Sequence, residues 1–281
     1  MANNVCEQLE SWSDLEGKVV LITGASSGFG WDFSINLTKA GCKVIAAARR
    51  VDRLETLCCL INKSSSSDAP LAVPLELDIT SDPPVIEAAV QKAWTAFGHI
   101  DVLINNAGVS GSTMSSLKLS TEEWNRVFKV NLDGAWLCSK YIGLHMQSAG
   151  RGGSIINISS ISRVNRGKNA GSLAYSSSKA ASHTMTQVMA LNFGEHSIRV
   201  NAIAPAIFRS AITKGLFETK WGRRVSDIIM PVANFYDATV DPSLTDLVRY
   251  LISGSSKYVT GNIFVVDAGY TNAGVPIWSS L

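Results

Sequence analysis

Charged residues are scarce in this 281-residue sequence: Asp, Glu, Lys and Arg together make up 17% of it, whereas hydrophobic residues make up 46%. A chain with so little charge and so many apolar side chains is not intrinsically disordered over most of its length. Lys and Arg number 25 and Asp and Glu 23, which leaves a formal net charge of only +2. This small surplus argues against a nucleic-acid or anionic-membrane surface, so any basic site must be local.

Long apolar runs and clustered metal ligands are also missing. No run reaches the roughly 18 residues that a membrane span requires. The first 17 residues carry acids in place of the apolar centre of a secretory signal. The five cysteines lack CxxC spacing, and the four histidines do not cluster with them, so we expect no metal site. These absences together favour a reduced, cytoplasmic protein.

Short β-branched runs alternate with longer amphipathic stretches along the chain. The pattern predicts strands at 18–24, 43–48, 71–78, 101–108, 152–160, 197–205 and 262–269, and helices at 28–40, 53–61, 82–97, 120–148, 173–194 and 242–253. The strands are apolar on both faces, which is typical of a parallel sheet covered by helices on both sides. The sequence therefore predicts one doubly wound α/β domain, a Rossmann fold of about seven parallel strands. We place it at 17–281, after an N-terminal extension at 1–16, and interpret 62–70 as a surface loop.

A glycine-rich turn, TGASSGFG at 23–30, joins the first predicted strand to the first helix. Glycines permit a tight turn and let backbone N–H groups approach a pyrophosphate, which the N-terminal end of the helix attracts. A structural turn that binds nothing is the alternative. The position after the first strand of a βαβ unit favours dinucleotide binding, with contacts from Gly24, Ser26, Ser27, Gly28, Phe29 and Gly30.

The end of the second predicted strand indicates which dinucleotide binds. NAD enzymes favour an acid there, which accepts hydrogen bonds from the ribose. This chain has Ala48-Arg49-Arg50 at that point and no acid before Asp52. Guanidinium groups suit a 2′-phosphate because they offer charge and a bidentate fork. The alternative is that both arginines begin a solvated helix. We predict NADP(H), with Arg49 on the 2′-phosphate and help from Arg50 or Ser26.

Six motifs follow one another in a specific order: TGASSGFG (23–30), LDIT (77–80), NNAG (105–108), KVN (129–131), NISS (157–160) and YSSSK (175–179). With them the chain resembles the short-chain dehydrogenase/reductase family over about residues 17–270. The segments IFRSAIT (207–213) and VVDAGYTNAGVPIWSSL (265–281) are similar to a plant branch often labelled 3-oxoacyl-carrier-protein-reductase-like. That label describes similarity and fixes no substrate.

The resemblance implies roles for individual residues. The catalytic group would be Asn131, Ser160, Tyr175 and Lys179. Further cofactor contacts would come from Asp78 and Ile79 at the adenine, and from Asn105, Ala107, Gly108, Tyr175, Lys179, Pro205, Ile207 and Ser210. The interval from Ser160 to Tyr175 is slightly longer than is common in the family, so Ser162 competes for the serine role. The family usually has Pro-Gly where this chain has Pro205-Ala206, which puts the cofactor pose in question.

The spacing of Tyr175 and Lys179 suits proton transfer. Reduction of a carbonyl leaves an alkoxide that needs a proton, and a free phenol has a pKa of about 10. Lys179 lies four residues on, on the same helical face. A unit charge about 5 Å away contributes roughly 3 kcal/mol toward the phenolate at an effective dielectric of 20. A serine would hold the substrate oxygen, and Asn131 would anchor a water in the proton path.

The substrate side is less well defined. In the family, residues 206–236 cover the substrate as a lid, and here they include Phe208, Phe217, Trp221, Phe235 and Tyr236. These rings favour an apolar carbonyl substrate, although they could instead pack the lid on the sheet. Val164, Asn165 and Leu173 are further pocket candidates. The resemblance also implies pairing of helices 120–148 and 173–194 between subunits, commonly in tetramers. We expect the apolar tail within 270–281 to pack at such a contact.

The predicted function is NADP(H)-dependent interconversion of a ketone or aldehyde and an alcohol, on an apolar small molecule of specialised metabolism. One alternative is a β-ketoacyl thioester reductase, which would use a plastid address that this N-terminus does not resemble. Another class is a redox-silent cyclase, isomerase or binding protein with the same fold. The intact Tyr175 and Lys179 pair argues against that class.

Overall fold

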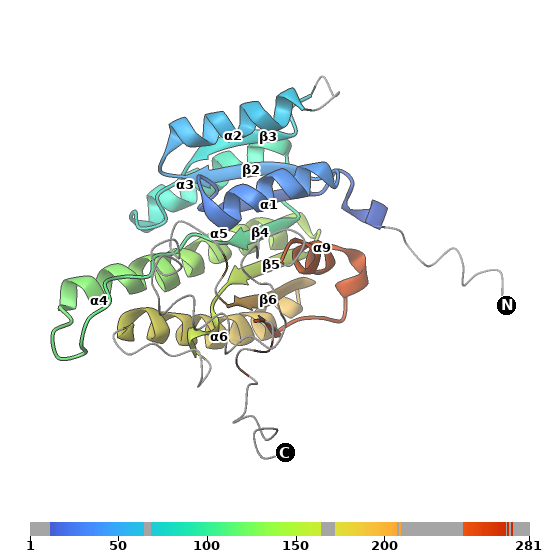
Figure 1. The fold of residues 1–281 in the computed structure, drawn as a ribbon. Helices are drawn as coiled ribbons and strands as arrows, with labels where there is room; N and C mark the ends of the chain where they lie inside the picture. Colours follow the sequence, from blue (N-terminus) through green and yellow to red (C-terminus); the bar gives the residue numbers. More distant parts are fainter. Residues whose placement is uncertain are drawn as a thin grey trace, which may run out of the picture.

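The computed structural model describes residues 12–64, 69–163, 172–206, 208, 244–267, 269 and 271. Within them, seven strands form one parallel sheet in the order β3-β2-β1-β4-β5-β6-β7 (Figure 1). The strands are β1 (Val19–Thr23), β2 (Lys43–Ala48), β3 (Ala72–Glu76), β4 (Val102–Asn105), β5 (Gly153–Ile158), β6 (Ile198–Pro205) and β7 (Ile263–Val266). The predicted doubly wound α/β fold is confirmed.

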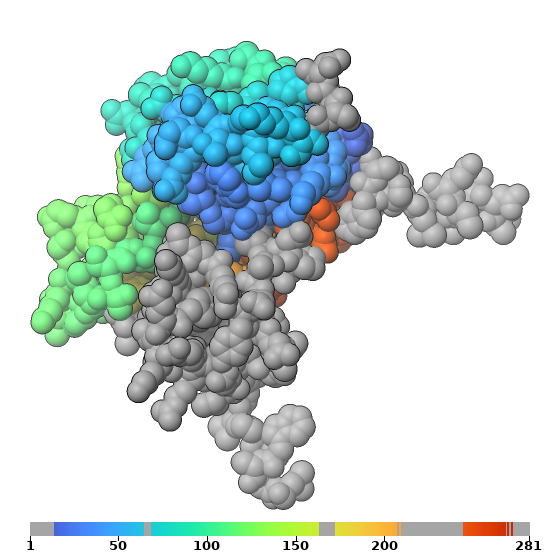
Figure 2. Space-filling view, turned by 45° about the horizontal axis from the view of Figure 1, so that its top comes forward, coloured from blue at the N-terminus to red at the C-terminus, as the bar shows by residue number. Residues whose placement is uncertain are grey.

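Helices cover both faces of the sheet. One face carries α1 (Gly28–Lys39), α2 (Val51–Lys63) and α9 (Thr245–Ile252), and the other carries α3 (Pro83–Phe97), α5 (Ala135–Ala149) and α6 (Leu173–Gly194). The helix α4 (Thr121–Phe128) continues into α5 through a π-helical stretch, Lys129–Gly134. The green segment around α4 projects from one side of the molecule (Figure 2). Short 3-10 helices lie at Trp12–Leu15, Ile161–Arg163 and Gly254–Ser256.

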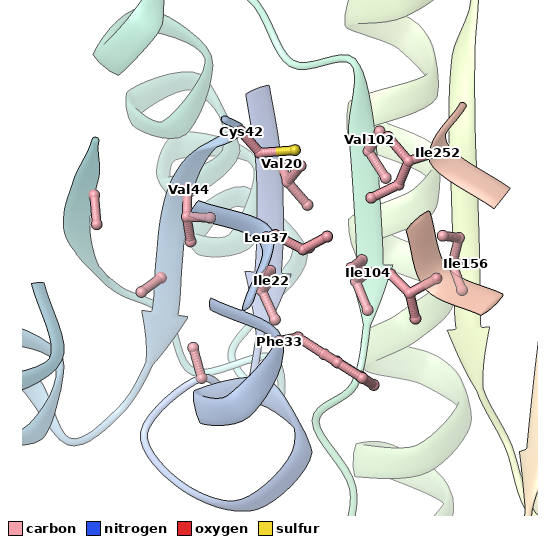
Figure 3. Packing of buried hydrophobic residues seen from close by; sticks show 14 of the residues in the cluster. Val20, Ile22, Phe33, Leu37, Cys42, Val44, Val102, Ile104, Ile156 and Ile252 are labelled. Atoms are coloured by element: carbon pink, nitrogen blue, oxygen red, sulfur yellow. The ribbon is translucent and has the colours of Figure 1, made fainter. Parts of the chain in front are cut away.

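The core consists of two apolar layers, one on each face of the sheet. In β1, Val20 and Ile22 pack in the layer with α1 and α9, whereas Val19 and Leu21 pack in the opposite layer. Figure 3 shows Phe33 of α1 close to the first layer's strand residues. All five side chains are fully buried, and each such burial stabilises the fold by about 1.5–3 kcal/mol. Strands buried on both faces explain why the sequence shows continuous apolar runs instead of alternation.

Several boundaries differ from the sequence prediction, and the strands predicted at 101–108 and 262–269 end at Asn105 and Val266. The second helix, predicted at 53–61, extends over Val51–Lys63, so the predicted loop at 62–70 begins inside it. A polar residue can continue a helix when its side chain has hydrogen-bond partners outside the helix. Asn62 accepts hydrogen bonds from the N–H groups of Leu71 and Ala72, both at 3.0 Å, and donates to the Ala72 carbonyl at 2.8 Å. These bonds connect the end of α2 to the start of β3.

The amino-terminal part of the described chain also joins the domain. Leu15, which the sequence placed in an extension, is fully buried in the core, and Asp14 accepts a hydrogen bond from the Gly254 N–H. The predicted lid at 206–236 and tail at 270–281 lie outside the described residues, except for Ala206, Phe208 and Thr271. In the described ranges, no helix combines the length and apolarity that crossing a membrane would take.

Candidate active site

A cavity lies where the strand order reverses. β1 lies between β2 and β4, and the chain builds outward from it through β2 on one side and β4 on the other. In open α/β sheets, ligands bind at the carboxyl ends of the strands at such a switch point. The cavity there has a volume of about 270 Å³. Its lining comes from the turns after β1, β2, β3, β4 and β5 and from α6.

Most of the predicted cofactor residues line this one cavity: Gly24, Ser26, Ser27, Gly28, Phe29, Arg49, Arg50, Asp78, Ile79, Ala107, Gly108, Tyr175 and Lys179. Gly30 and Asn105 are buried and do not line it, and Pro205 ends β6. Ile207 and Ser210 fall outside the described residues. The sequence reasoning did not single out eight further lining residues: Ala48, Leu77, Thr80, Asn106, Val109, Val130, Ile158 and Ser159.

The glycine-rich turn is pressed against the turn that follows β4. Gly24 has φ of +69°, and a Cβ added to it would lie 2.8 Å from the Ala107 Cα. A Cβ on Gly30 would lie 2.7 Å from the Gly24 carbonyl oxygen. Side chains at these positions would therefore collide with backbone. The first turn of α1, beginning at Gly28, lies at the cavity with its backbone N–H groups and its partial positive charge. This cradle fits a dinucleotide pyrophosphate.

Asn106 holds the two turns together. Its side-chain nitrogen donates to the Thr23 carbonyl at 2.9 Å and to the Gly24 carbonyl at 3.3 Å. In return, the Thr23 hydroxyl accepts hydrogen bonds from the N–H groups of Asn106 and Ala107, both at 3.1 Å. Sequence reasoning chose the neighbouring Asn105 for the channel. The sequence predicted this strand to run over 101–108 and so gave no signal for Asn106; the structure ends β4 at Asn105, and Asn106 is the first residue to leave the sheet.

The two arginines after β2 have different surroundings. Arg50 donates through Nη2 to the hydroxyls of Ser26 and Ser27, each at 2.9 Å, and through Nε to Ser26 at 3.2 Å. Arg49 is exposed and acts electrostatically on Asp78. Burial raises the pKa of Asp78, but hydrogen bonds from Thr80 and the charge of Arg49 outweigh it, and the pKa is lowered overall. Two cations and two hydroxyls thus gather at one end of the cavity.

The other end of the cavity holds a tyrosine–lysine pair on α6, of which the lysine is buried and the tyrosine partly buried. Lys179 is only 6% exposed, and its Nζ lies 5.8 Å from the centre of the Tyr175 ring. The ammonium donates to the Ile158 carbonyl at 2.8 Å. Burial lowers the pKa of Lys179 to about 8. Burial also raises the pKa of Tyr175, which a hydrogen bond with Ser160 opposes. The sequence argument counted only the attraction of the ammonium, whereas burial acts on both groups.

Asn131 joins this group through its neighbours. It lies in the π-helical stretch, is 3% exposed, and exchanges two hydrogen bonds of 2.9 Å with the Val109 backbone. It also donates to the Ser178 hydroxyl at 3.0 Å, which in turn donates to the Tyr175 carbonyl at 2.8 Å. A Cβ on Gly108 would lie 3.4 Å from the Asn131 Oδ1 and 3.7 Å from the Lys179 Nζ. The side chain of Asn131 therefore anchors the turn after β4 to α6.

A layer of buried polar side chains links the sheet to α6, the helix that carries the pair. Asn105 donates to the Ser139 hydroxyl and to the Asn157 Oδ1, both at 2.8 Å, and Asn157 donates to the Thr186 hydroxyl at 2.9 Å. Thr186 in turn donates to the Ser182 carbonyl. Each side chain is 5% exposed or less. The layer ties β4 and β5 to α5 and α6, and Asn105 belongs to it instead of to the cavity wall.

Two serines follow β5. Ser160 is 8% exposed, and its Oγ lies 2.9 Å from the Ser162 Oγ and accepts a hydrogen bond from the Ser162 N–H at 3.1 Å. Ser160, Tyr175, Lys179 and Asn131 are therefore brought together as predicted. Among the substrate candidates, Phe208 is buried and stacks edge-on with Phe29 at 5.8 Å, which favours a packing role. Leu173 is 41% exposed, and Val164 and Asn165 lie outside the described residues.

Comparison with known proteins agrees with this geometry. Residues 18–221 match the family model described as short chain dehydrogenase. The chain belongs to the short chain dehydrogenase family. The 3-oxoacyl-[acyl-carrier-protein] reductase of Thermotoga maritima is 33% identical over 255 residues, which cover 91% of this chain and 98% of that protein. The 3-alpha-(or 20-beta)-hydroxysteroid dehydrogenase of Mycobacterium tuberculosis is 35% identical over 264 residues, which cover 91% and 90%.

Solved structures of this family have the same fold. The 3-ketoacyl-(acyl-carrier-protein) reductase of Brucella melitensis, complexed with NADH, superimposes with a TM-score of 0.79 at 27% identity. The match covers 92% of this chain and 99% of that one. The protein is therefore an oxidoreductase of the short chain dehydrogenase family that interconverts carbonyl and alcohol groups.

Proposed function

We propose that this oxidoreductase uses NADP(H) to interconvert a ketone or aldehyde and an alcohol on an apolar small molecule of specialised metabolism. One observation carries the proposal: the glycine cradle, the two arginines, Tyr175 and the buried Lys179 line a single cavity. A structural glycine turn or a solvated arginine pair would not require a buried ammonium beside a phenol at the other end. The same observation argues against a redox-silent protein.

Each residue of the pair and its serine has a chemical task. A bound nicotinamide cofactor would supply the hydride for the carbonyl carbon in the reductive direction. Tyr175 donates its hydroxyl proton to the oxygen that becomes the alcohol, and Ser160 donates a hydrogen bond to that oxygen. The Lys179 ammonium stabilises the phenolate that Tyr175 becomes. The Ile158 carbonyl and the burial around Lys179 keep the ammonium in place before the substrate arrives.

The proposed preference for NADP(H) rests on charge at the adenosine end. Arg49 and Arg50 line the cavity, and Ser26 and Ser27 hold the Arg50 guanidinium against the glycine turn. A pre-positioned guanidinium suits a 2′-phosphate because little side-chain freedom remains to be lost. The Brucella relative was crystallised with NADH, so the preference of this chain has to come from its own residues.

The proposed substrate is apolar, in line with the aromatic residues that the sequence places at 206–236. A β-ketoacyl thioester is the second candidate, favoured by the 33% identity to the Thermotoga reductase. The test follows NADPH absorbance with aromatic ketones, steroid ketones and acetoacetyl thioesters as substrates, and repeats each assay with NADH. Turnover of the ketones with NADPH would support the proposal. Turnover of the thioester alone would favour the second candidate, and NADH turnover at equal efficiency would overturn the cofactor preference.

We further propose a cytoplasmic homo-oligomer, a dimer or tetramer. Apolar side chains stay exposed along α5 and α6: Trp136 (48%), Leu144 (47%), Val188 (51%) and Leu191 (80%). Exposed apolar residues on two long helices favour a contact with another subunit. Light scattering at micromolar concentration tests this, and a monomer would refute it. We also propose that the protein belongs to the plant branch that segments 207–213 and 265–281 resemble.

A further inference from the structure

The hydroxyl of Ser160 has more partners than it has protons. Its oxygen accepts from the Ser162 N–H at 3.1 Å, lies 2.9 Å from the Ser162 hydroxyl, and forms a hydrogen bond with Tyr175. A serine hydroxyl offers one proton and two lone pairs. Only one of the two hydroxyl contacts can therefore use the Ser160 proton.

The role of Ser160 in the proposed function decides where that proton lies. Ser160 uses its single proton on the oxygen where reaction occurs, so its two lone pairs are the groups that remain for Ser162. The Ser162 N–H occupies one lone pair of Ser160. The Ser162 hydroxyl, 2.9 Å away, then donates to the other. The order of donation is Ser162 to Ser160 to the reacting oxygen.

We propose that Ser162 is a positioning residue whose hydroxyl donates to Ser160 and so directs the single Ser160 proton toward the oxygen where reaction occurs. The inference rests on the proposed function and deepens it, because it assigns different tasks to two serines that the sequence leaves as competitors. Ser160 touches the substrate oxygen, and Ser162 acts through Ser160. Hydrogen bonds in such a chain polarise one another, so Ser160 becomes a better donor than an isolated serine.

The test compares three variants by their kcat for ketone reduction with NADPH. Ser162→Ala removes the hydroxyl but keeps the N–H contact, and we expect kcat to fall roughly five- to tenfold, the equivalent of one hydrogen bond. Ser162→Thr keeps a hydroxyl and is expected to restore most of the activity. Ser176→Ala is the matched control: it breaks another serine–serine contact on α6, the 3.0 Å pair with Ser172, and is expected to leave kcat unchanged.

A second readout works without turnover. Phenolate absorbance of each variant, minus that of the same variant carrying Tyr175→Phe, reports the titration of Tyr175. Lys179 is the cation beside Tyr175 and is kept in every variant. Ser162→Ala is expected to move the titration to higher pH, and Ser162→Thr to return it. If wild-type protein reduced no carbonyl compound but showed this shift, the proposed function would fail while the inference would stand.

Three results would overturn the inference. The first is an unchanged kcat and titration in Ser162→Ala. The second is a loss in Ser162→Ala as large as in Ser160→Ala, which would place Ser162 on the substrate itself. The third is a titration that moves to lower pH, which would mean that Ser160 donates to Ser162. Ser162→Cys, with a weak donor of similar size, provides the same comparison should the alanine variant fail to fold.

Discussion

The positively charged groups at the two ends of the cavity differ in their exposure to solvent. At the adenosine end, Arg49 and Arg50 are exposed, and hydroxyl groups of the glycine turn hold Arg50. At the catalytic end, Lys179 is buried, donates to a backbone carbonyl, and has a pKa lowered to about 8. Salt screens charges that are exposed in this way. Salt screens the buried ammonium much less, but this group can lose its proton.

This difference assigns separate tasks to the two ends. A permanent, exposed charge suits recognition of a phosphate, which is also exposed and charged. A buried charge close to its titration point suits proton transfer, because small changes in its surroundings move its protonation state. The comparison predicts that changes at one end alter cofactor choice and changes at the other alter turnover and its pH dependence.

The largest effect is expected from removal of the proton donor. Tyr175→Phe should lower kcat by about 10²–10⁴-fold, the usual contribution of a general acid. NADPH affinity should stay within a few-fold of wild type, because the glycine cradle and the arginines are unchanged. Stopped-flow kinetics and fluorescence titration measure the two quantities. A variant that kept most of its kcat would remove Tyr175 from the mechanism.

Reversal of charge at the adenosine end should change cofactor choice. Arg49→Asp removes a donor and repels a 2′-phosphate; one charge-assisted contact contributes roughly 1.5–3 kcal/mol, about ten- to a hundredfold. The ratio of kcat/KM for NADPH over NADH should fall by that factor, and high salt should narrow the wild-type ratio. Arg53→Asp makes the same charge change on α2 outside the cavity lining and serves as control. An unchanged ratio in Arg49→Asp would contradict the assignment.

The pH dependence of kcat/KM should follow the protonation state of Lys179. Its pKa of about 8 means that the ammonium is charged below that pH and neutral above it. Because burial raises the pKa of Tyr175, the phenol keeps its proton through this range. In the reductive direction, kcat/KM should therefore fall above about pH 8. Lys179→Arg, which does not titrate there, should move this limb upward by more than one pH unit if the variant is active. If the fall in kcat/KM stayed at the same pH in an active Lys179→Arg enzyme, the titrating group would not be Lys179.

The smallest effect on catalysis is expected from the buried polar layer. Thr186→Val leaves the Asn157 amide without its 2.9 Å acceptor. An unsatisfied buried donor costs roughly 1–3 kcal/mol of folding stability. Thr184→Val, at an exposed position of the same helix, is the control. Urea unfolding should show the loss only for Thr186→Val, with kcat of the folded enzyme close to wild type. Equal stability of the two variants would show that the layer contributes little.

Sequence patterns predicted the fold well, because a parallel sheet leaves a strong signal. Each strand is a short β-branched run, and turns such as Gly41, with φ of +90°, end helices where expected. The largest errors were at the ends of β4 and β7, each predicted three residues too far along the chain. Both ends of α2 were also misplaced, because polar Asn62 and Lys63 suggested a loop. Asn62 accepts hydrogen bonds from Leu71 and Ala72, and a local pattern does not contain those partners.

The sequence predicted which residues form the candidate site better than it predicted the contacts between them. Motif order brought Tyr175, Lys179 and Ser160 together, but the hydrogen bond of Lys179 to Ile158 and the direction of its pKa depend on burial, which only the folded chain defines. For the same reason, the sequence did not show which of Asn105 and Asn106 lines the cavity. Only the folded chain shows that Asn106 lines the cavity, whereas Asn105 is buried and hydrogen-bonded to Ser139 and Asn157.

A double-mutant cycle of NADPH affinity tests most directly whether the two ends act independently. Calorimetric titration of wild type, Arg49→Asp, Tyr175→Phe and the double variant gives four binding free energies. Independent ends predict that the two single effects add within about 0.3–0.5 kcal/mol, with nearly all of the loss in Arg49→Asp. A coupling well above that range, or a loss of affinity in Tyr175→Phe as large as in Arg49→Asp, would contradict the account.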